Sequence, residues 1–542
     1  QHAITNITMR KHLSSSSSII SAASTSVGKR SNSQDEEQLF FVTSYSNFDK
    51  LAHGPRGTEA THSLYIYSFH PSDGSLVLLN VQGSNAVLNP AFTRYHPKLN
   101  VVYTCTEDIE EEGLIYSYKL SPDGQLIPLD DNAPIKAGGT STCYLTIDRE
   151  QKHMLAVNYW NSTLAVIPMD PNTGALGKEI KSMYDPKGGK KMVAAAKKDG
   201  GVNHSCNDTS TIQQRQADPH SHALVLDPFV GTIAYVPDLG KDVIREFLYN
   251  SKDGKIECEM NMLPSGLCTG HPDGPRYLEF HPRYNVAYVV NELSSTVAVF
   301  EVDRDLLQEI DTAVRNGEDS LERFRGRSTL RLIQSIRTIP NAFPNTLNTC
   351  GRICVHQSGR FVVVSNRGHQ SICVYKVMKR GRLDVVGHFH TRGETPRHFQ
   401  FDHSGQYLLV ANQDTDSLAV FSFNLSTGQI QYTGNEYRVP SPNFVCCCPM
   451  YQNDDEDDEV ENGITNNATI ADVVASGDHE IPSSVRPHPE LVVGNNTKNM
   501  NDGNSSDSDD STIRTDRPLS IIKPSLEEQL KQAQEEIQQL RA

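Results

Sequence analysis

Residues 273–303 read Asp-Gly-Pro-Arg-Tyr-Leu-Glu-Phe-His-Pro-Arg-Tyr-Asn-Val-Ala-Tyr-Val-Val-Asn-Glu-Leu-Ser-Ser-Thr-Val-Ala-Val-Phe-Glu-Val-Asp, and this stretch decides the fold. Runs rich in Val, Tyr and Phe occupy 277–280, 286–290 and 296–302, and they are separated by a turn at 281–285 and a polar corner at 291–295. Such short runs broken by Pro, Asn and Ser are strand and turn signals. The stretch therefore predicts three short antiparallel strands.

The same pattern recurs along the chain, for example at 222–248 and 397–423. A repeat of roughly 40–50 residues with about four strands is typical of a β-propeller blade. Seven units are found, at about 38–82, 88–130, 139–180, 218–260, 273–338, 348–392 and 394–440. The first unit lacks an opening strand, and residues 441–446 form a strand without a unit. We therefore expect an all-β, seven-bladed β-propeller over 37–450, closed by a C-terminal strand in the first blade.

The segments outside the repeats have other compositions. Residues 1–36 are rich in Ser and basic, which suits a disordered arm or an organellar transit segment. Residues 451–522 should form an acidic disordered tail, and 523–542 a short amphipathic helix that could serve weak oligomerisation or docking. Two insertions interrupt the repeats: 184–216 reads as a surface loop, and 304–326 has helical spacing of its apolar residues.

Charge and cysteine content exclude several classes. The net charge is −16, but residues 452–511 alone hold fifteen Asp and Glu against two basic residues, so the remainder is near neutral and nucleic-acid binding is not expected. No apolar run approaches the ~18 residues that span a membrane. Eleven cysteines without framework spacing favour a reducing, cytoplasmic compartment. Cys446, Cys447 and Cys448 could form a metal or redox cluster, but we interpret them as small apolar strand residues.

Polar residues are predicted to gather at one mouth of the central channel. The residue that opens strand one and the residue that ends strand two lie sixteen positions apart in three units, and antiparallel pairing places both at the same rim. These pairs are His222/Asp238, Arg276/Glu292 and Arg397/Gln413. The strand-two corner in all seven units reads Tyr45, Glu107, Tyr159, Asp238, Glu292, Arg367 and Gln413. With His220 and His369 added, this rim suits an anionic substrate held by Arg next to a group that transfers protons.

These residues also permit simpler interpretations than a catalytic one. Arg276 and Glu292 could form only a buried ion pair. His220 and His222 could bind a metal, but no third ligand at suitable spacing joins them, so neither metal nor cofactor is expected. Ser221 is rejected as a nucleophile because no nucleophile elbow surrounds it and its side chain should point away from both histidines.

An ordered set of motifs spans residues 38–449 and resembles the seven-bladed-propeller lactonase family, which includes bacterial-type 6-phosphogluconolactonase and fungal carboxy-cis,cis-muconate cyclase. The motifs are Arg215-Gln216 with Pro219-His-Ser-His222, Val236-Pro-Asp-Leu-Gly240, Gly274-Pro-Arg276, Tyr288-Val-Val-Asn-Glu-Leu293, Val364-Ser-Asn-Arg-Gly-His369, Thr395-Pro-Arg397 and Leu409-Val-Ala-Asn-Gln413. The insertions and both tails depart from the family pattern, and the 304–326 segment raises the question of substrate access.

The resemblance implies hydrolysis of the ring ester of an anionic sugar lactone, with 6-phosphogluconolactone as the expected substrate. It implies a site made of Arg276, Glu292, Arg367 and either His220 or His222, and from this set the catalytic candidates are Glu292, His222, His220 and Arg276. The rim reading supplies the substrate-binding candidates, which are Arg367, Arg397, Asp238, His369, Gln413 and Glu107. In the expected mechanism the arginines clamp the anion and polarise the carbonyl, while Glu292 or one of the two histidines is the general base. Two alternatives remain open at this stage: a muconate-type lactonizing cyclase and a non-catalytic propeller that binds a partner.

Overall fold

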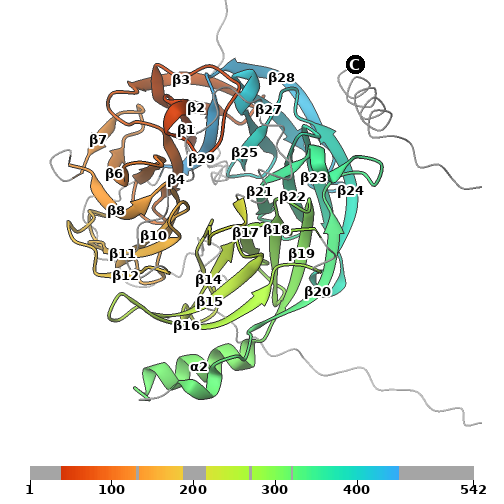
Figure 1. Cartoon of the computed structure of the whole chain (residues 1–542). Helices are drawn as coiled ribbons and strands as arrows, with labels where there is room; N and C mark the ends of the chain where they lie inside the picture. Colours follow the sequence, from red (N-terminus) through yellow and green to blue (C-terminus); the bar gives the residue numbers. More distant parts are fainter. Residues whose placement is uncertain (1–37, 130–132, 187–214, 268–270, 319–320, 451–542) are drawn as a thin grey trace, which may run out of the picture. The chain divides into compact units, whose positions relative to one another are not determined.

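Seven antiparallel sheets are arranged in a ring about a central axis, and the innermost strand of each sheet lies nearest that axis (Figure 1). The structure is a computed structural model, and it describes residues 38–129, 133–186, 215–267, 271–318 and 321–450. The predicted seven-bladed propeller is therefore confirmed. The expectations for residues 1–36, 451–522 and 523–542, and for most of 184–216, lie outside the described residues.

The strands follow the predicted units closely. From the axis outward, the first three blades are β29 (Pro442–Pro449), β1 (Gln38–Ser44), β2 (His62–His70) and β3 (Ser75–Gly83); β4 (Pro90–Tyr95), β5 (Val101–Thr106), β6 (Glu112–Leu120) and β7 (Leu126–Pro128), with β8 (Ile135–Thr140) also beside β6; and β9 (Thr142–Ile147), β10 (His153–Asn158), β11 (Thr163–Pro168) and β12 (Ser182–Tyr184).

The other four blades have the same order. They are β13 (Val225–Leu226), β14 (Ile233–Asp238), β15 (Val243–Asn250) and β16 (Lys255–Pro264); β17 (Pro275–Phe280), β18 (Val286–Asn291), β19 (Thr296–Val302) and β20 (Leu330–Arg337); β21 (Thr349–Val355), β22 (Phe361–Arg367), β23 (Ser371–Val377) and β24 (Leu383–His390); and β25 (Pro396–Phe401), β26 (Tyr407–Asn412), β27 (Ser417–Phe423) and β28 (Ile430–Arg438). Short 3-10 turns are η1 (Phe48–Lys50), η3 (Glu322–Phe324), η4 (Asn345–Leu347), η5 (Lys379–Gly381) and η6 (Gln413–Thr415).

The C-terminal strand closes the ring, as predicted. β29 pairs antiparallel with β1, from Gln38 opposite Pro449 to Ser44 opposite Pro442. This pairing gives the first blade its innermost strand and satisfies the edge of β1. The three consecutive cysteines, Cys446–Cys448, lie on this strand as free thiols, which agrees with their interpretation as strand residues.

The core lies between neighbouring blades. Each sheet is covered on both faces, and the second strand of a blade is therefore buried on both sides, as in β18, where all six residues are buried. This explains why the second strands read as continuous apolar runs rather than alternating ones. Between the last two blades, for example, Phe361, Val363, Phe399 and Val410 belong to one apolar cluster.

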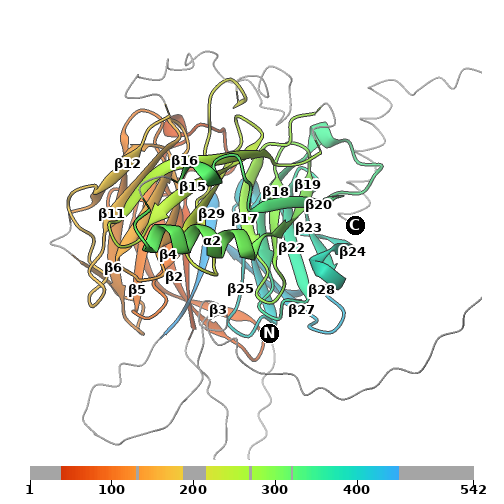
Figure 2. The same cartoon turned by 90° about the horizontal axis from the view of Figure 1, so that it is seen from below.

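The insertion after β19 forms helix α2 (Arg304–Arg315), as its spacing predicted. Asp303 caps the helix by accepting a hydrogen bond from the Leu306 amide at 2.9 Å. The helix lies outside the ring (Figures 1 and 2) and packs on the turn between β13 and β14, where the Thr232 hydroxyl donates to Asp311 at 2.7 Å. That turn lies at one rim of the ring, whereas the predicted site residues lie at the opposite rim, where the first strands begin and the second strands end. Helix α2 therefore leaves that mouth uncovered. No helix in the described parts of the chain is long and apolar enough to cross a membrane.

Candidate active site

A cavity of about 280 Å³ opens at the mouth of the channel where the predicted polar residues gather. Eight of the ten predicted site residues line it: Glu107, His220, His222, Arg276, Glu292, Arg367, Arg397 and Gln413. They come from blades that are distant in sequence, which means that the ring closure assembles the cavity.

An extra residue in the innermost strand of every blade explains how side chains reach the cavity. In β17 the pairing moves from Pro275–Asn291 to Tyr277–Val290, which leaves Arg276 in a bulge. Arg397 in β25 is bulged in the same way. Register shifts also place one extra residue in each of β29, β4, β9 and β21. In the fourth blade Ser221 pairs with Asp238 and Val225 with Tyr235, so the segment that leads into β13 has one residue more than the facing part of β14. A bulge redirects a side chain without changing the alternation on either side.

The corner after the second strand supplies the other lining residues. Asn291 ends β18 opposite Pro275, and Glu292 follows it at the corner. The predicted spacing of sixteen is correct in the fifth and seventh blades, but the paired residues, Pro275 with Asn291 and Pro396 with Asn412, are one position earlier than expected. In the fourth blade Ser221 pairs with Asp238, seventeen positions away.

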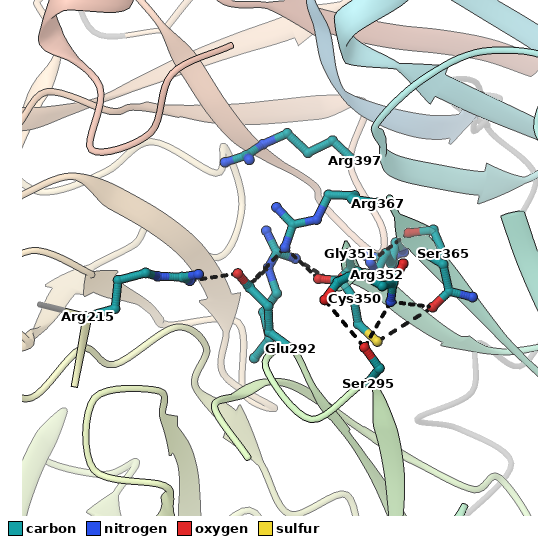
Figure 3. A network of polar contacts seen from close by, with 12 residues as sticks. Arg215, Glu292, Ser295, Cys350, Gly351, Arg352, Ser365, Arg367 and Arg397 are labelled. Atoms are coloured by element: carbon teal, nitrogen blue, oxygen red, sulfur yellow. Dashed lines mark hydrogen bonds and ion pairs between the residues drawn. The ribbon is translucent and has the colours of Figure 1, made fainter. Parts of the chain in front are cut away.

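Glu292 is the centre of an ion-pair cluster (Figure 3). Arg215 Nη2 donates to its Oε1 at 2.6 Å, while Arg276 Nε lies 3.1 Å and Arg367 Nη2 3.0 Å from its Oε2. Burial would raise the pKa of this carboxyl group, but the three guanidinium groups outweigh it and hold the pKa well below its usual range. Burial, together with the other nearby arginines, lowers the pKa of Arg367 to about 10. Glu292 is therefore ionised at neutral pH and is a very weak base.

Glu107 forms a second cluster in the same cavity. Tyr45 Oη donates to its Oε2 at 2.7 Å, Arg397 Nη2 donates to the Tyr45 hydroxyl at 2.9 Å, and His53 Nδ1 lies 3.6 Å from its Oε1. Burial opposes ionisation of Glu107, but the contacts with His53, Arg397 and Tyr45 prevail and lower its pKa to about 2. This half of the cavity therefore holds one fixed negative charge beside one guanidinium and one imidazole.

The predicted histidines differ in their partners. His220 Nδ1 bonds to the Tyr159 carbonyl at 3.1 Å, and its ring stacks on the Tyr159 ring with a centroid distance of 4.8 Å. His222 is buried, and its Nδ1 has no hydrogen-bond partner among the described residues. Burial, and then the charge of Arg276, lowers the pKa of His222 well below its usual value. Burial also lowers the pKa of His220. Both imidazoles are therefore neutral at pH 7.

Two predicted binding residues do not line the cavity. Asp238 is fully buried beside it, where it accepts from the His220 amide at 2.8 Å and pairs with Arg245 at 2.9 Å. In this blade Leu239 occupies the corner, and Asp238 holds the preceding position, so the sequence interpretation was offset by one residue.

His369 is the second predicted binding residue that does not line the cavity. Its Nδ1 bonds to Ser371 Oγ at 2.7 Å, and its ring packs edge-on against Phe343. Gly368, with φ +125°, turns the chain between Arg367 and His369. Arg367 therefore lines the cavity, whereas His369 packs against Phe343. Ser221, which the sequence had excluded as a nucleophile, bonds to Ser162 at 2.6 Å.

Aromatic rings form a layer below the bulged residues. Phe92 lies 4.5 Å from Tyr144 and 4.6 Å from Phe444, and His398 stacks on Phe444 at 3.7 Å, all between ring centroids. Tyr144 also contacts Tyr277, at 5.6 Å. These five residues come from the innermost strands of five blades. Three of them, Tyr277, His398 and Phe444, line a second, smaller pocket that shares Glu107, His222, Arg276 and Arg397 with the cavity.

Three of the lining residues that were not predicted as site residues bear on the chemistry of the cavity: Arg215, His53 and Trp160. Arg215 is part of a family motif and lies at the end of the 184–216 insertion. His53 and Trp160 come from loops, where no strand periodicity marks them. Trp160 is the single tryptophan of the chain, and its ring lies 5.7 Å from that of His220.

Fold and site together define a β-propeller with an arginine-rich cavity at one mouth of its channel. The chain belongs to the family described as Lactonase, 7-bladed beta-propeller, whose model matches residues 40–447.

Curated relatives carry a more specific name. The 6-phosphogluconolactonase of Bacillus subtilis (strain 168) is 29% identical over 391 residues, which cover 71% of this chain and 95% of the relative. That of Formosa agariphila is 26% identical over 388 residues, with 69% and 92% covered. The solved periplasmic gluconolactonase of Pseudomonas aeruginosa has a TM-score of 0.59 at 22% identity and covers 76% of this chain and 99% of its own. A protein from Lactobacillus plantarum gives 0.56 at 20%, with 76% and 99% covered. These two structures support the fold alone.

Proposed function

We propose that this chain hydrolyses the ring ester of an anionic sugar lactone, and that its substrate is 6-phosphogluconolactone, which it converts to 6-phosphogluconate. The names of the two curated relatives support this substrate. We further propose a cytoplasmic location and a role in the pentose phosphate pathway. The free thiols of the cysteines in the described ranges are compatible with a reducing compartment.

The excess of positive charge in the cavity carries the proposal. Arg215, Arg276, Arg367 and Arg397 face the carboxylates of Glu292 and Glu107, while Arg56 pairs with Asp414 at the rim. The imidazoles are neutral, so the excess is two positive charges. A phosphate monoester carries about −1.5 to −2 charges at pH 7. A phosphorylated lactone would therefore neutralise the excess positive charge of the cavity, whereas an uncharged lactone would leave that excess without a counter-charge.

The geometry supports a division of roles within this reaction. Glu292 holds Arg276 and Arg367 in fixed positions, and guanidinium groups bind phosphate or carboxylate with directed hydrogen bonds. An arginine that faces the lactone carbonyl stabilises the oxyanion that forms when water attacks. Because its pKa is strongly lowered, Glu292 is assigned this positioning role and not that of the base. The base is then one of the neutral imidazoles that line the cavity.

The experiment compares hydrolysis of 6-phosphogluconolactone with that of unphosphorylated gluconolactone, after subtraction of the spontaneous rate. Arg276→Ala and Glu292→Ala should each lower kcat/KM for the phosphorylated lactone by about 10²-fold or more, on the order of two charge-assisted hydrogen bonds. Arg315→Ala, which removes an exposed guanidinium on α2, is the matched control and should leave the rate unchanged.

Circular-dichroism spectra must match that of the wild type for the comparison to count. Absence of lactone hydrolysis by the wild type, or wild-type rates in both cavity variants, would exclude the proposed function.

A further inference from the structure

The imidazole of His53 faces a buried carboxylate in a way that no other histidine of the cavity does. Its Nδ1 lies 3.6 Å from Glu107 Oε1, and its Nε2 is buried without a hydrogen-bond partner among the described residues. By contrast, His220 is held by a backbone carbonyl, and the Nδ1 of His222 has no partner in the described part of the chain. His53 and Glu107 therefore form a carboxylate–imidazole pair with the second ring nitrogen directed away from the carboxylate.

The loop that carries His53 is fixed across the junction of the first and last blades. Arg56 Nη2 pairs with Asp414 at 3.1 Å, and Thr58 Oγ1 donates to Asp416 at 2.6 Å. A Cβ at Gly57 would lie 2.5 Å from the Gln413 backbone oxygen, so the loop approaches the last blade more closely than a side chain would permit. His53 is thus held in one place over the cavity even though it lies on a loop.

The surrounding charges set the state of both groups. Glu107 stays ionised because its pKa is about 2. Burial, and then Arg397, lowers the pKa of His53, while Glu107 raises it and Arg367 lowers it slightly. The Tyr45 ring packs against the imidazole at 5.2 Å, and its phenol remains protonated because burial raises its pKa. His53 is therefore neutral at pH 7. The tautomer that places the proton on Nδ1, beside the carboxylate, leaves the lone pair on Nε2.

We propose that His53 is the general base of lactone hydrolysis and that Glu107 orients it. This inference rests on the proposed function. Nε2 accepts a proton from water as the water oxygen bonds to the lactone carbonyl carbon, and Arg397 lies next to the oxyanion that forms. When the tetrahedral intermediate collapses, the bond from the carbonyl carbon to the ring oxygen breaks. The ring oxygen takes the proton from Nε2 and becomes a hydroxyl group, and the carboxylic acid is released.

The decisive variant is His53→Asn, measured with 6-phosphogluconolactone. We expect kcat to fall by about 10²- to 10⁴-fold, the usual contribution of a general base, with KM changed little. Binding of inorganic phosphate, followed by the fluorescence of Trp160, should stay at the wild-type level. His70→Asn removes an exposed histidine at the end of β2 and is the matched control. A wild-type kcat for His53→Asn would overturn the proposal.

Glu107→Gln tests the orienting role independently. The carboxylate stabilises the imidazolium, so its removal lowers the pKa of His53. We expect a lower kcat and an acid limb of the pH–rate profile that moves to lower pH. An unchanged midpoint would show that Glu107 acts only on structure, and the orienting role would be withdrawn. If the wild type hydrolyses no anionic lactone, the proposed function fails, whereas hydrolysis that survives in His53→Asn refutes only the base.

Discussion

Replacement of Glu107 by Gln should destabilise the propeller by an amount that depends strongly on pH. The carboxyl group has a pKa of about 2 in the folded chain against 4.5 for the ordinary group. A depressed carboxyl pKa stabilises the fold above the unfolded value, and this contribution disappears as the pH falls through the folded value. At 1.36 kcal/mol per pKa unit, the charge contributes about 3 kcal/mol at pH 7 and roughly 1.4 kcal/mol at pH 3.

The assay is thermal unfolding of the two proteins between pH 7 and pH 3. With an unfolding entropy of ~2.1 cal/mol/K per residue over roughly 400 residues, the pH 7 contribution corresponds to about 3–4 °C in Tm. The difference in Tm between wild type and Glu107→Gln should shrink by more than half at pH 3. Glu257→Gln, an exposed carboxylate on β16, is the control and should show no such trend. A difference that is constant over this range would refute the reasoning about the buried charge.

Three further predictions concern binding, backbone and closure. Because Trp160 lines the cavity, titration with inorganic phosphate should change the intrinsic fluorescence of the wild type, and Arg276→Ala should weaken that response by about tenfold or more. Gly368→Ala should lower Tm by several degrees because the new Cβ would lie 1.9 Å from the Leu347 carbonyl oxygen. Gly317→Ala is the control: its Cβ would have no neighbour within 4 Å, so the free energy of unfolding should fall by only about 1 kcal/mol. Removal of residues 442–542 should abolish soluble folding because β1 keeps β2 but loses its inner partner β29, while removal of 451–542 should preserve lactone hydrolysis. Equal behaviour of the two truncations would contradict this role of β29.

The fold could be predicted because each blade repeats the same local signals. Buried second strands such as 286–290 read as apolar runs, and turn residues end them at regular intervals. The first unit has one strand too few, and residues 441–446 supply one strand too many. Because a closed ring leaves no sheet edge unpaired, these two observations together predict that the C-terminal strand completes the first blade.

The site could be predicted only in part, because a register error of one residue moves a side chain to the opposite face. In the fourth blade the corner is the apolar Leu239, whereas the polar pattern of the sequence points to its neighbour Asp238. The bulge that offsets the pairing has no signal in a single sequence. His53 lies in a loop whose position depends on contacts with the last blade, so no local pattern marked it.

The seven bulges separate the chemistry of the channel mouth from the packing of the blades. A bulged residue takes no place in the alternation that fills the space between sheets, and the described positions already hold residues as different as Ala91, Cys143, Arg276 and Arg397. Substitution at such a position changes what the mouth can recognise while the apolar layers keep their partners. The same scaffold can therefore acquire a new substrate through a few exchanges around one circle of residues, without a second set of changes to restore its stability.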